Sequence, residues 1–182
     1  MSRLDRLVDR YADHIATPWP AGLSGIERVI FVVYPPADEL RLRIYIDEFE
    51  LRTRDAGHGW RLLDLTAAFP QWMAAHRYRE KYFRRPTLLA GYPEGRLAEF
   101  TAHLVEQTRA QVAATPADDV VALAGVGTLF GVSSVSEVVN GAASAINGRL
   151  VVFFPGEKDG NIYRLLDARD GWDYMAHAIT AD

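Results

Sequence analysis

The sequence predicts one α/β domain over residues 1–182: a three-layer sandwich with a mostly parallel sheet of about five strands. Three runs, Arg28–Tyr34, Asp119–Ala124 and Arg149–Phe154, are almost continuously apolar and rich in β-branched residues. Such runs are typical of strands buried on both faces, as in parallel sheets. Helical patterns alternate with them, and no repeat or linker divides the chain. The expected architecture is P-loop-NTPase-like or Rossmann-like, without a Walker A loop.

The first third of the chain predicts a helix, a strand and a second helix. Over residues 2–15 the apolar side chains fall on one helical face, and Ser2 is a suitable N-cap. The prolines of 17–20 end this helix, and the strand Arg28–Tyr34 follows. Residues 38–54 fit either a strand or a helix. We expect a helix, capped by Asp38, because a parallel pair of strands needs a crossover connection.

The middle of the chain predicts two further strands with helices between them. Trp60–Leu65 is the next strand, and Thr66–Arg85 is expected to be helical in part. Residues 94–114 make a clearer helix with one apolar face. The buried strand Asp119–Ala124 follows, and Ser136–Ile146 is the next helix.

The last segment predicts a strand, a turn, a hairpin return and a helix. The strand is Arg149–Phe154, and the turn is Pro155–Gly160. Ile162–Leu166 is expected to return along the sheet edge as a short hairpin strand. Trp172–Ile179 is expected to form a short final helix.

Composition excludes several classes of function. The chain has no cysteine, so a thiolate nucleophile or a cysteine zinc site is excluded. Its net charge of −4 is a poor match to general nucleic-acid binding. The charged start, residues 1–6, is not a signal peptide, and no run approaches the ~18 apolar residues of a membrane span. We therefore expect a cytoplasmic protein that does not enter a membrane.

Candidate ligand-binding residues follow the predicted strands, because parallel sheets bind ligands beyond the carboxyl ends of their strands. The plainer interpretation is that these segments are only the turns that any α/β fold needs. The turn Gly125–Gly131 is one residue too long for the dinucleotide fingerprint, although its amides could face an anion. The candidates are Tyr34, Asp64, Gly125, Gly127, Thr128, Gly156, Glu157 and Asp159.

Catalytic and metal-binding patterns are missing from the sequence. There is no nucleophile elbow around a serine, and the histidines are not spaced as metal ligands. We therefore expect no catalytic residue, no metal and no cofactor.

A basic and aromatic cluster between residues 76 and 85 is the sharpest local charge signal. Such residues can hold phosphates and stack on bases, and arginine and tyrosine are also favoured anchors of protein interfaces. A solvated face is the plainer interpretation. The candidate interface residues are Arg77, Tyr78, Arg79, Lys81, Tyr82, Arg84 and Arg85.

Three segments together resemble one family. They are the turn Tyr34–Arg43 after the first buried strand, the segment Ala124–Phe130, and Val151–Gly160. Their order and spacing are similar to those of the BrxB family, the small accessory component of BREX phage-defence systems. Phe153-Phe154-Pro155-Gly156-Glu157 is the most specific part. The resemblance is that of a divergent member, since Gly131 stands where the family usually has proline.

The resemblance implies a non-catalytic accessory or assembly subunit of an antiphage system. Its implied partners are larger defence components: a methyltransferase, a phosphatase-like protein or a large ATPase. Two alternatives remain open, a nucleotide- or anion-binding regulatory domain and a subunit that contacts DNA through residues 76–85. Nucleic acid is the less favoured partner, and a homodimer also stays open.

Overall fold

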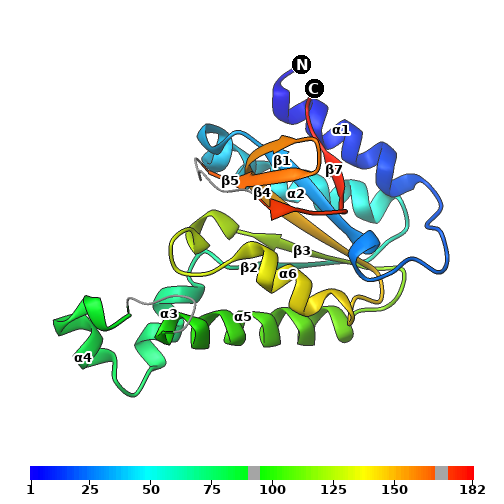
Figure 1. Ribbon diagram of the computed structural model, residues 1–182. Coiled ribbons are helices and arrows are strands. Elements are labelled where there is room, and N and C mark those ends of the chain that lie inside the picture. The colour runs from blue at the N-terminus through cyan, green and yellow to red at the C-terminus, as the bar shows by residue number, and fades with distance from the viewer. Residues whose placement is uncertain (90–94, 167–171) are drawn as a thin grey trace.

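The computed structural model describes residues 1–89, 95–166 and 172–182, and it has the predicted α/β architecture, with helices on both faces of a mostly parallel sheet (Figure 1). The main strands lie in the order β2-β3-β4-β1-β7, and all four neighbouring pairs are parallel. Their bounds are β1 Val29–Tyr34, β2 Trp60–Asp64, β3 Val120–Ala124, β4 Arg149–Asp159 and β7 His177–Ile179.

The order of the strands in the sheet tests whether the fold is Rossmann-like. In the Rossmann fold the first strand lies between the second and the fourth. Here β1 lies between β4 and the last strand, β7. The sheet therefore does not have the Rossmann strand order.

Two helices cover one face of the sheet. They are α1, Arg3–Ala16, and α2, Glu39–Asp55, and their apolar sides pack on alternate residues of β1, β3 and β4. The helical interpretation of residues 38–54 is thus confirmed. Ser2 caps α1 as predicted, in a capping box with Asp5. Asp38 occupies the N-cap position of α2, but its carboxylate pairs with Arg3 and Arg41 and caps no amide.

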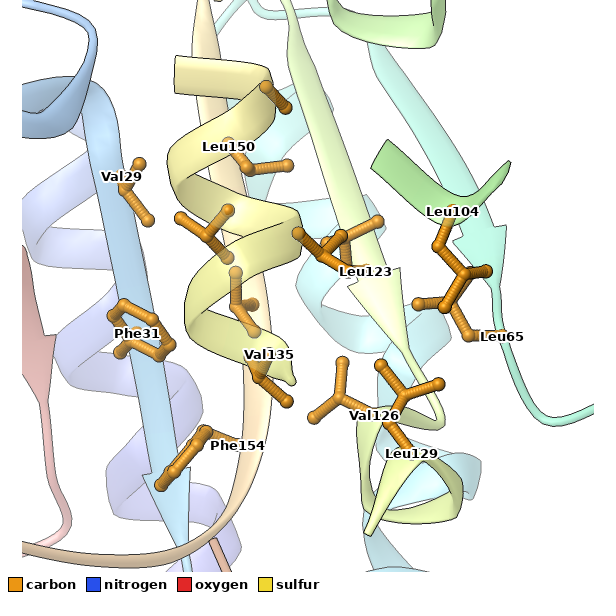
Figure 2. Close-up of a cluster of buried hydrophobic side chains, with 14 of the residues drawn as sticks. Val29, Phe31, Leu65, Leu104, Leu123, Val126, Leu129, Val135, Leu150 and Phe154 are labelled. Atoms are coloured by element: carbon orange, nitrogen blue, oxygen red, sulfur yellow. The ribbon is translucent and has the colours of Figure 1, made fainter. Parts of the chain in front are cut away.

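The opposite face is covered by α5, Arg96–Ala113, and α6, Val135–Ala143. Figure 2 shows part of this cluster, with Phe31 of β1, Leu123 of β3 and Val135 of α6 among its buried side chains. The two cores together bury both faces of β1, β3 and most of β4, which explains why these strands read as continuous apolar runs. Strand β2 is an edge strand and is largely exposed.

The predicted turn Pro155–Gly160 is mostly strand, which is a correction. Strand β4 continues to Asp159, and the chain reverses at Gly160, where φ is 58°. The return strand β5, Ile162–Leu165, pairs antiparallel with β4 as the predicted hairpin, and β6, Trp172–Asp173, pairs with β5. A Cβ on Gly156 would lie 2.0 Å from the carbonyl oxygen of Arg164, so only glycine allows this close pairing.

The predicted final helix, Trp172–Ile179, is also wrong. Residues 177–179 form β7, which lies parallel to β1 with Ile30 opposite His177. Without β7 the backbone groups on that side of β1 would be an open sheet edge. The segment is too short for its apolar spacing to distinguish a helix from a strand, and pairing with β1 decides the outcome.

The partly helical region after β2 is confirmed and divides into short pieces. Helix α3, Ala68–Ala75, packs Met73 into the body, and α4, Arg79–Arg84, follows a break at residues 76–78. Three 3₁₀ turns punctuate the chain at Ile26–Arg28, Pro36–Asp38 and Val126–Leu129, and a fourth, Pro86–Leu89, follows α4. The predicted helix start at Glu94 lies outside the described residues. Among the helices that the structure describes, none is long and apolar enough to cross a membrane.

Candidate functional site

Three of the residues singled out at strand ends lie around one small pocket at the carboxyl edge of the sheet. Tyr34 ends β1, Asp64 ends β2, and Gly125 follows β3. All three line a cavity of about 170 Å³. The pocket is closed by residues of α2, namely Glu39, Leu42, Arg43, Ile46 and Asp47.

A chain of hydrogen bonds crosses this pocket from one strand end to another. The hydroxyl of Tyr34 donates to Glu39, and Arg43 donates to Glu39 at 3.1 Å. The same Nη2 atom of Arg43 lies 2.8 Å from the hydroxyl oxygen of Thr66, which in turn donates to Asp64. The backbone amide of Thr66 also donates to Asp64, at 2.9 Å. Helix α2 is thereby tied to the ends of both β1 and β2.

Gly125 is required beside this chain. Its φ is 72°, in the left-handed region that L side chains rarely adopt. A Cβ there would lie 2.4 Å from the hydroxyl oxygen of Thr66 and 2.8 Å from Oδ1 of Asp64. Glycine therefore lets the β3 turn approach the polar chain closely.

The surroundings shift two ionisation equilibria in the pocket. Burial raises the pKa of Tyr34, and its hydrogen bond to Glu39 raises the pKa further, so the phenol stays protonated as a donor. Burial alone would raise the pKa of Asp64. Its hydrogen bonds from Thr66 and the charge of Arg43 outweigh burial, and the net pKa is lowered.

The charge balance of the pocket disfavours an anion. In the part of the lining that the structure describes, Glu39, Asp47 and Asp64 contribute three carboxylates against the single guanidinium of Arg43. Apart from Asp47, these groups bond to one another or to Tyr34 and Thr66. Within the described residues, no group of three or more histidine, aspartate or glutamate side chains could hold a metal ion. The arrangement serves as a structural tie at this edge.

The remaining strand-end candidates lie apart from this pocket. The hydroxyl of Thr128 donates to the carbonyl oxygen of Gly125 at 2.8 Å, which closes the 3₁₀ turn that also contains Gly127. Gly156 and Glu157 line a different cavity, of about 310 Å³, beside Arg3, Lys158 and the chain end. Asp159 is exposed at the hairpin end of β4.

The basic and aromatic cluster forms an arm, residues 76–89, which contains α4 and the 3₁₀ turn after it. In Figure 1, α4 extends past the end of α5, away from the sheet. Tyr82 is only 4% exposed and anchors the arm, with its ring 5.1 Å from that of His76. His76 in turn lies 5.1 Å from the ring of Trp72 in α3.

The outer side of the arm is both apolar and cationic. Phe83 is 60% exposed and Tyr78 42%, and the guanidinium of Arg77 lies 4.6 Å from the Tyr78 ring centre. A hollow of about 370 Å³ lies between Tyr78, Lys81, Tyr82, Leu88 and Arg96. Among the described residues, no carboxylate forms an ion pair with any of the five cations Arg77, Arg79, Lys81, Arg84 and Arg85.

Sequence reasoning did not identify Glu39, Arg43 and Thr66 as neighbours of the strand ends. A usable signal was present, because Glu39 and Arg43 are four residues apart in the helix that follows Tyr34, and Thr66 lies two residues after Asp64. Comparisons with family models, with curated proteins and with solved structures found no match.

Proposed function

We propose that this protein is a non-catalytic assembly subunit of a bacterial antiphage defence system of the BREX type, and that it binds a larger component through the arm. The observation that carries the proposal is the composition of the arm's outer side. It combines exposed Tyr78, Phe83 and Leu88 with five cations that have no carboxylate partner among the described residues. The motif resemblance to the BrxB family supports the choice of system.

The arm has the chemistry of a protein interface. Scattered exposed apolar residues are normal, but aromatic and arginine side chains gathered on one projection are the residue types that dominate interface energetics. The partner surface should be acidic, to pair with residues such as Arg84 and Arg85. It should also present an apolar side chain to the hollow beside Tyr78 and Leu88.

DNA fits the arm less well. A phosphate backbone would satisfy the cations, but it would not cover Phe83 and Leu88. The rest of the chain provides no broad basic surface, since its net charge is −4. A nucleotide at the carboxyl edge of the sheet is disfavoured by the carboxylates Glu39, Asp47 and Asp64.

The test is recovery of partners from the native host by the tagged chain, identified by mass spectrometry. The wild type should recover a methyltransferase, a phosphatase-like protein or a large ATPase. The double variant Arg84→Glu/Arg85→Glu should lose that partner, and so should Phe83→Ser, because a charged or polar residue then faces the docking surface.

A matched control reverses two arginines elsewhere. Arg52 and Arg54 are exposed on α2 and pair with Glu48 and Glu50. Arg52→Glu/Arg54→Glu should recover the partner as the wild type does. Equal recovery by the arm variants and the control would contradict the assigned interface. Recovery of DNA alone, released by nuclease, would favour the nucleic-acid alternative.

A further inference from the structure

A second pocket lies at the opposite edge of the sheet, where the strands begin. It has a volume of about 250 Å³ and is lined near the starts of β1, β4 and β7 by Ile30, Arg149 and His177. Ligand pockets for drug-sized molecules measure about 300–1,000 Å³, so this pocket suits a smaller group. The other walls come from α1 and the segment after it, including His14 and Trp19.

Arg149 is the unusual residue of this pocket. It is 7% exposed, and its guanidinium lies 4.4 Å from the ring centre of Trp19. One nitrogen donates to the carbonyl oxygen of Gly148 at 3.1 Å. Among the described residues, no carboxylate pairs with it, although guanidinium carries five donors. A buried cation without a counter-ion is costly, and an anion in the pocket would remove that cost.

Two imidazoles lie beside Arg149. The rings of His14 and His177 stack with centres 4.0 Å apart and planes 7° apart, which joins α1 to β7. Burial lowers the pKa of His14 to about 4, and the charges of His177 and Arg149 add to the effect. Burial also lowers the pKa of His177, with a contribution from Lys158. Neither imidazole hydrogen-bonds to a residue that the structure describes, so both can turn donors towards a ligand.

Glu27 is the one carboxylate among the described lining residues, and it already accepts hydrogen bonds within the protein. Glu27 accepts hydrogen bonds from the amide of Ser24 at 2.8 Å and from its hydroxyl at 2.7 Å. Nearby Arg28 adds positive potential, which lowers the pKa of Arg149, although burial is the larger cause. Among the described residues, the lining thus carries one guanidinium and one carboxylate, with Arg28 as a second cation nearby, whereas carboxylates outnumber cations in the pocket at the carboxyl edge.

We propose that this pocket binds the phosphate group of a small ligand, with Arg149 as the main donor and His14 and His177 as further donors. A guanidinium fork matches phosphate oxygens in two parallel hydrogen bonds. A phosphate dianion can accept from Arg149 and both imidazoles together, which a carboxylate with two oxygens does less completely. This site is independent of the proposed docking arm.

Isothermal titration calorimetry with inorganic phosphate and with adenosine monophosphate tests the proposal. The wild type should bind, and Arg149→Gln should weaken binding about tenfold or more, because hydrogen bonds to charged groups are strong. Arg84→Gln on the arm removes the same charge far from the pocket and should bind as the wild type does. Absence of binding to both probes, or unchanged affinity in Arg149→Gln, would overturn the proposal.

The two probes distinguish the source of the phosphate. Equal affinities would identify free phosphate as the ligand. Tighter binding of adenosine monophosphate than of inorganic phosphate would identify a nucleotide as the ligand. Arg149→Gln removes an unpaired buried charge, so folding should be retained. His177→Gln, at the start of β7, provides a second variant that should also weaken binding.

The affinity for sulfate, measured over a series of pH values, tests whether His14 and His177 contact the ligand. A purely structural role of the two histidines would not make this affinity depend on pH. Sulfate stays a dianion, so any change in its affinity reports on the protein. Because the pKa of His14 is about 4 and that of His177 is also lowered, protonation of the pair should make sulfate bind more tightly at about pH 4.5 than at about pH 7.5. Glu27, Arg28, Lys158 and Arg149 also face this region. The effect should disappear in His14→Gln/His177→Gln, and a pH effect that persists there would contradict the assignment.

Discussion

The guanidinium of Arg43 lies 2.8 Å from the hydroxyl oxygen of Thr66, and this contact joins helix α2 to the loop after β2. The Thr66 hydroxyl then donates to Asp64. Among the described residues that line this pocket, Arg43 is the one guanidinium beside three carboxylates. Removing it should leave Glu39 and Asp64 without their shared cation.

Arg43→Met should therefore lower the free energy of unfolding by about 1–2 kcal/mol. This loss lies between the stabilisation by an exposed ion pair and that by a hydrogen bond to a charged group. Urea denaturation measures this difference. Arg41→Met is the matched control, since Arg41 is exposed and, within the described ranges, forms an ion pair with Asp38 alone. The control should change stability by less than about 0.5 kcal/mol. Equal losses in the two variants would show that the polar chain adds nothing.

Gly125→Ala and Gly131→Ala separate backbone strain from steric conflict. Both glycines have positive φ, 72° and 77°. A Cβ at Gly131 meets nothing within 4 Å, so Gly131→Ala should cost only strain, about 1–2 kcal/mol. A Cβ at Gly125 would collide with Thr66 and Asp64, which should add about 1–3 kcal/mol more. Thermal or urea unfolding checks the ranking, and equal effects would contradict the close approach.

Local sequence patterns predict much of the fold. The segments that were predicted wrongly share one cause, because their structure depends on pairing with another strand. Strands such as β1 and β3 are buried on both faces, so their apolar runs identify them without knowledge of their neighbours. Residues 177–179 become a strand only because β1 leaves an edge to pair with. The extension of β4 past Pro155 likewise depends on pairing with β5.

The residues of the two pockets differ in the same respect, namely whether a local sequence pattern can identify them. Tyr34, Asp64 and Gly125 were found because they end predicted strands, and the sheet brings such ends to one edge. His14 and His177 were interpreted as scattered, since no local pattern joins residues at the two ends of a chain. Their stacking depends on residues 177–179 forming a strand beside β1, whereas the local sequence pattern predicts a helix there.

Tyr82 and Tyr78 should have opposite roles in the arm. Tyr82 is buried and anchors α4, whereas Tyr78 is exposed. Truncating a buried aromatic costs about 3–5 kcal/mol in a core, so Tyr82→Ala should open the arm and speed tryptic cleavage at its basic residues at least tenfold. Tyr78→Ala should be cleaved as the wild type is. Cleavage at the wild-type rate in Tyr82→Ala would contradict the anchoring role.

The stacked histidines should make stability depend on pH. Folding lowers the pKa of His14 from 6.5 to about 4, so between these values the unfolded chain binds more protons than the folded chain. The free energy of unfolding should therefore be highest above about pH 6.5, fall as the pH drops towards 4, and add no further loss from His14 below that.

The variant His14→Asn isolates this contribution, because it keeps a polar side chain that does not titrate. Urea unfolding at a series of pH values should show a shallower slope between pH 6.5 and about 4 than the wild type has. Gln107→Asn, at an exposed position of α5 without a titratable group, should leave the slope unchanged. Carboxylates whose pKa is lowered by folding, such as Asp64, change the stability mainly at about pH 4 and below, and all three proteins contain them. Identical slopes in His14→Asn and the wild type would mean that His14 ionises freely in the folded chain, and the stacked pair would then not hold α1 to β7 in its neutral form.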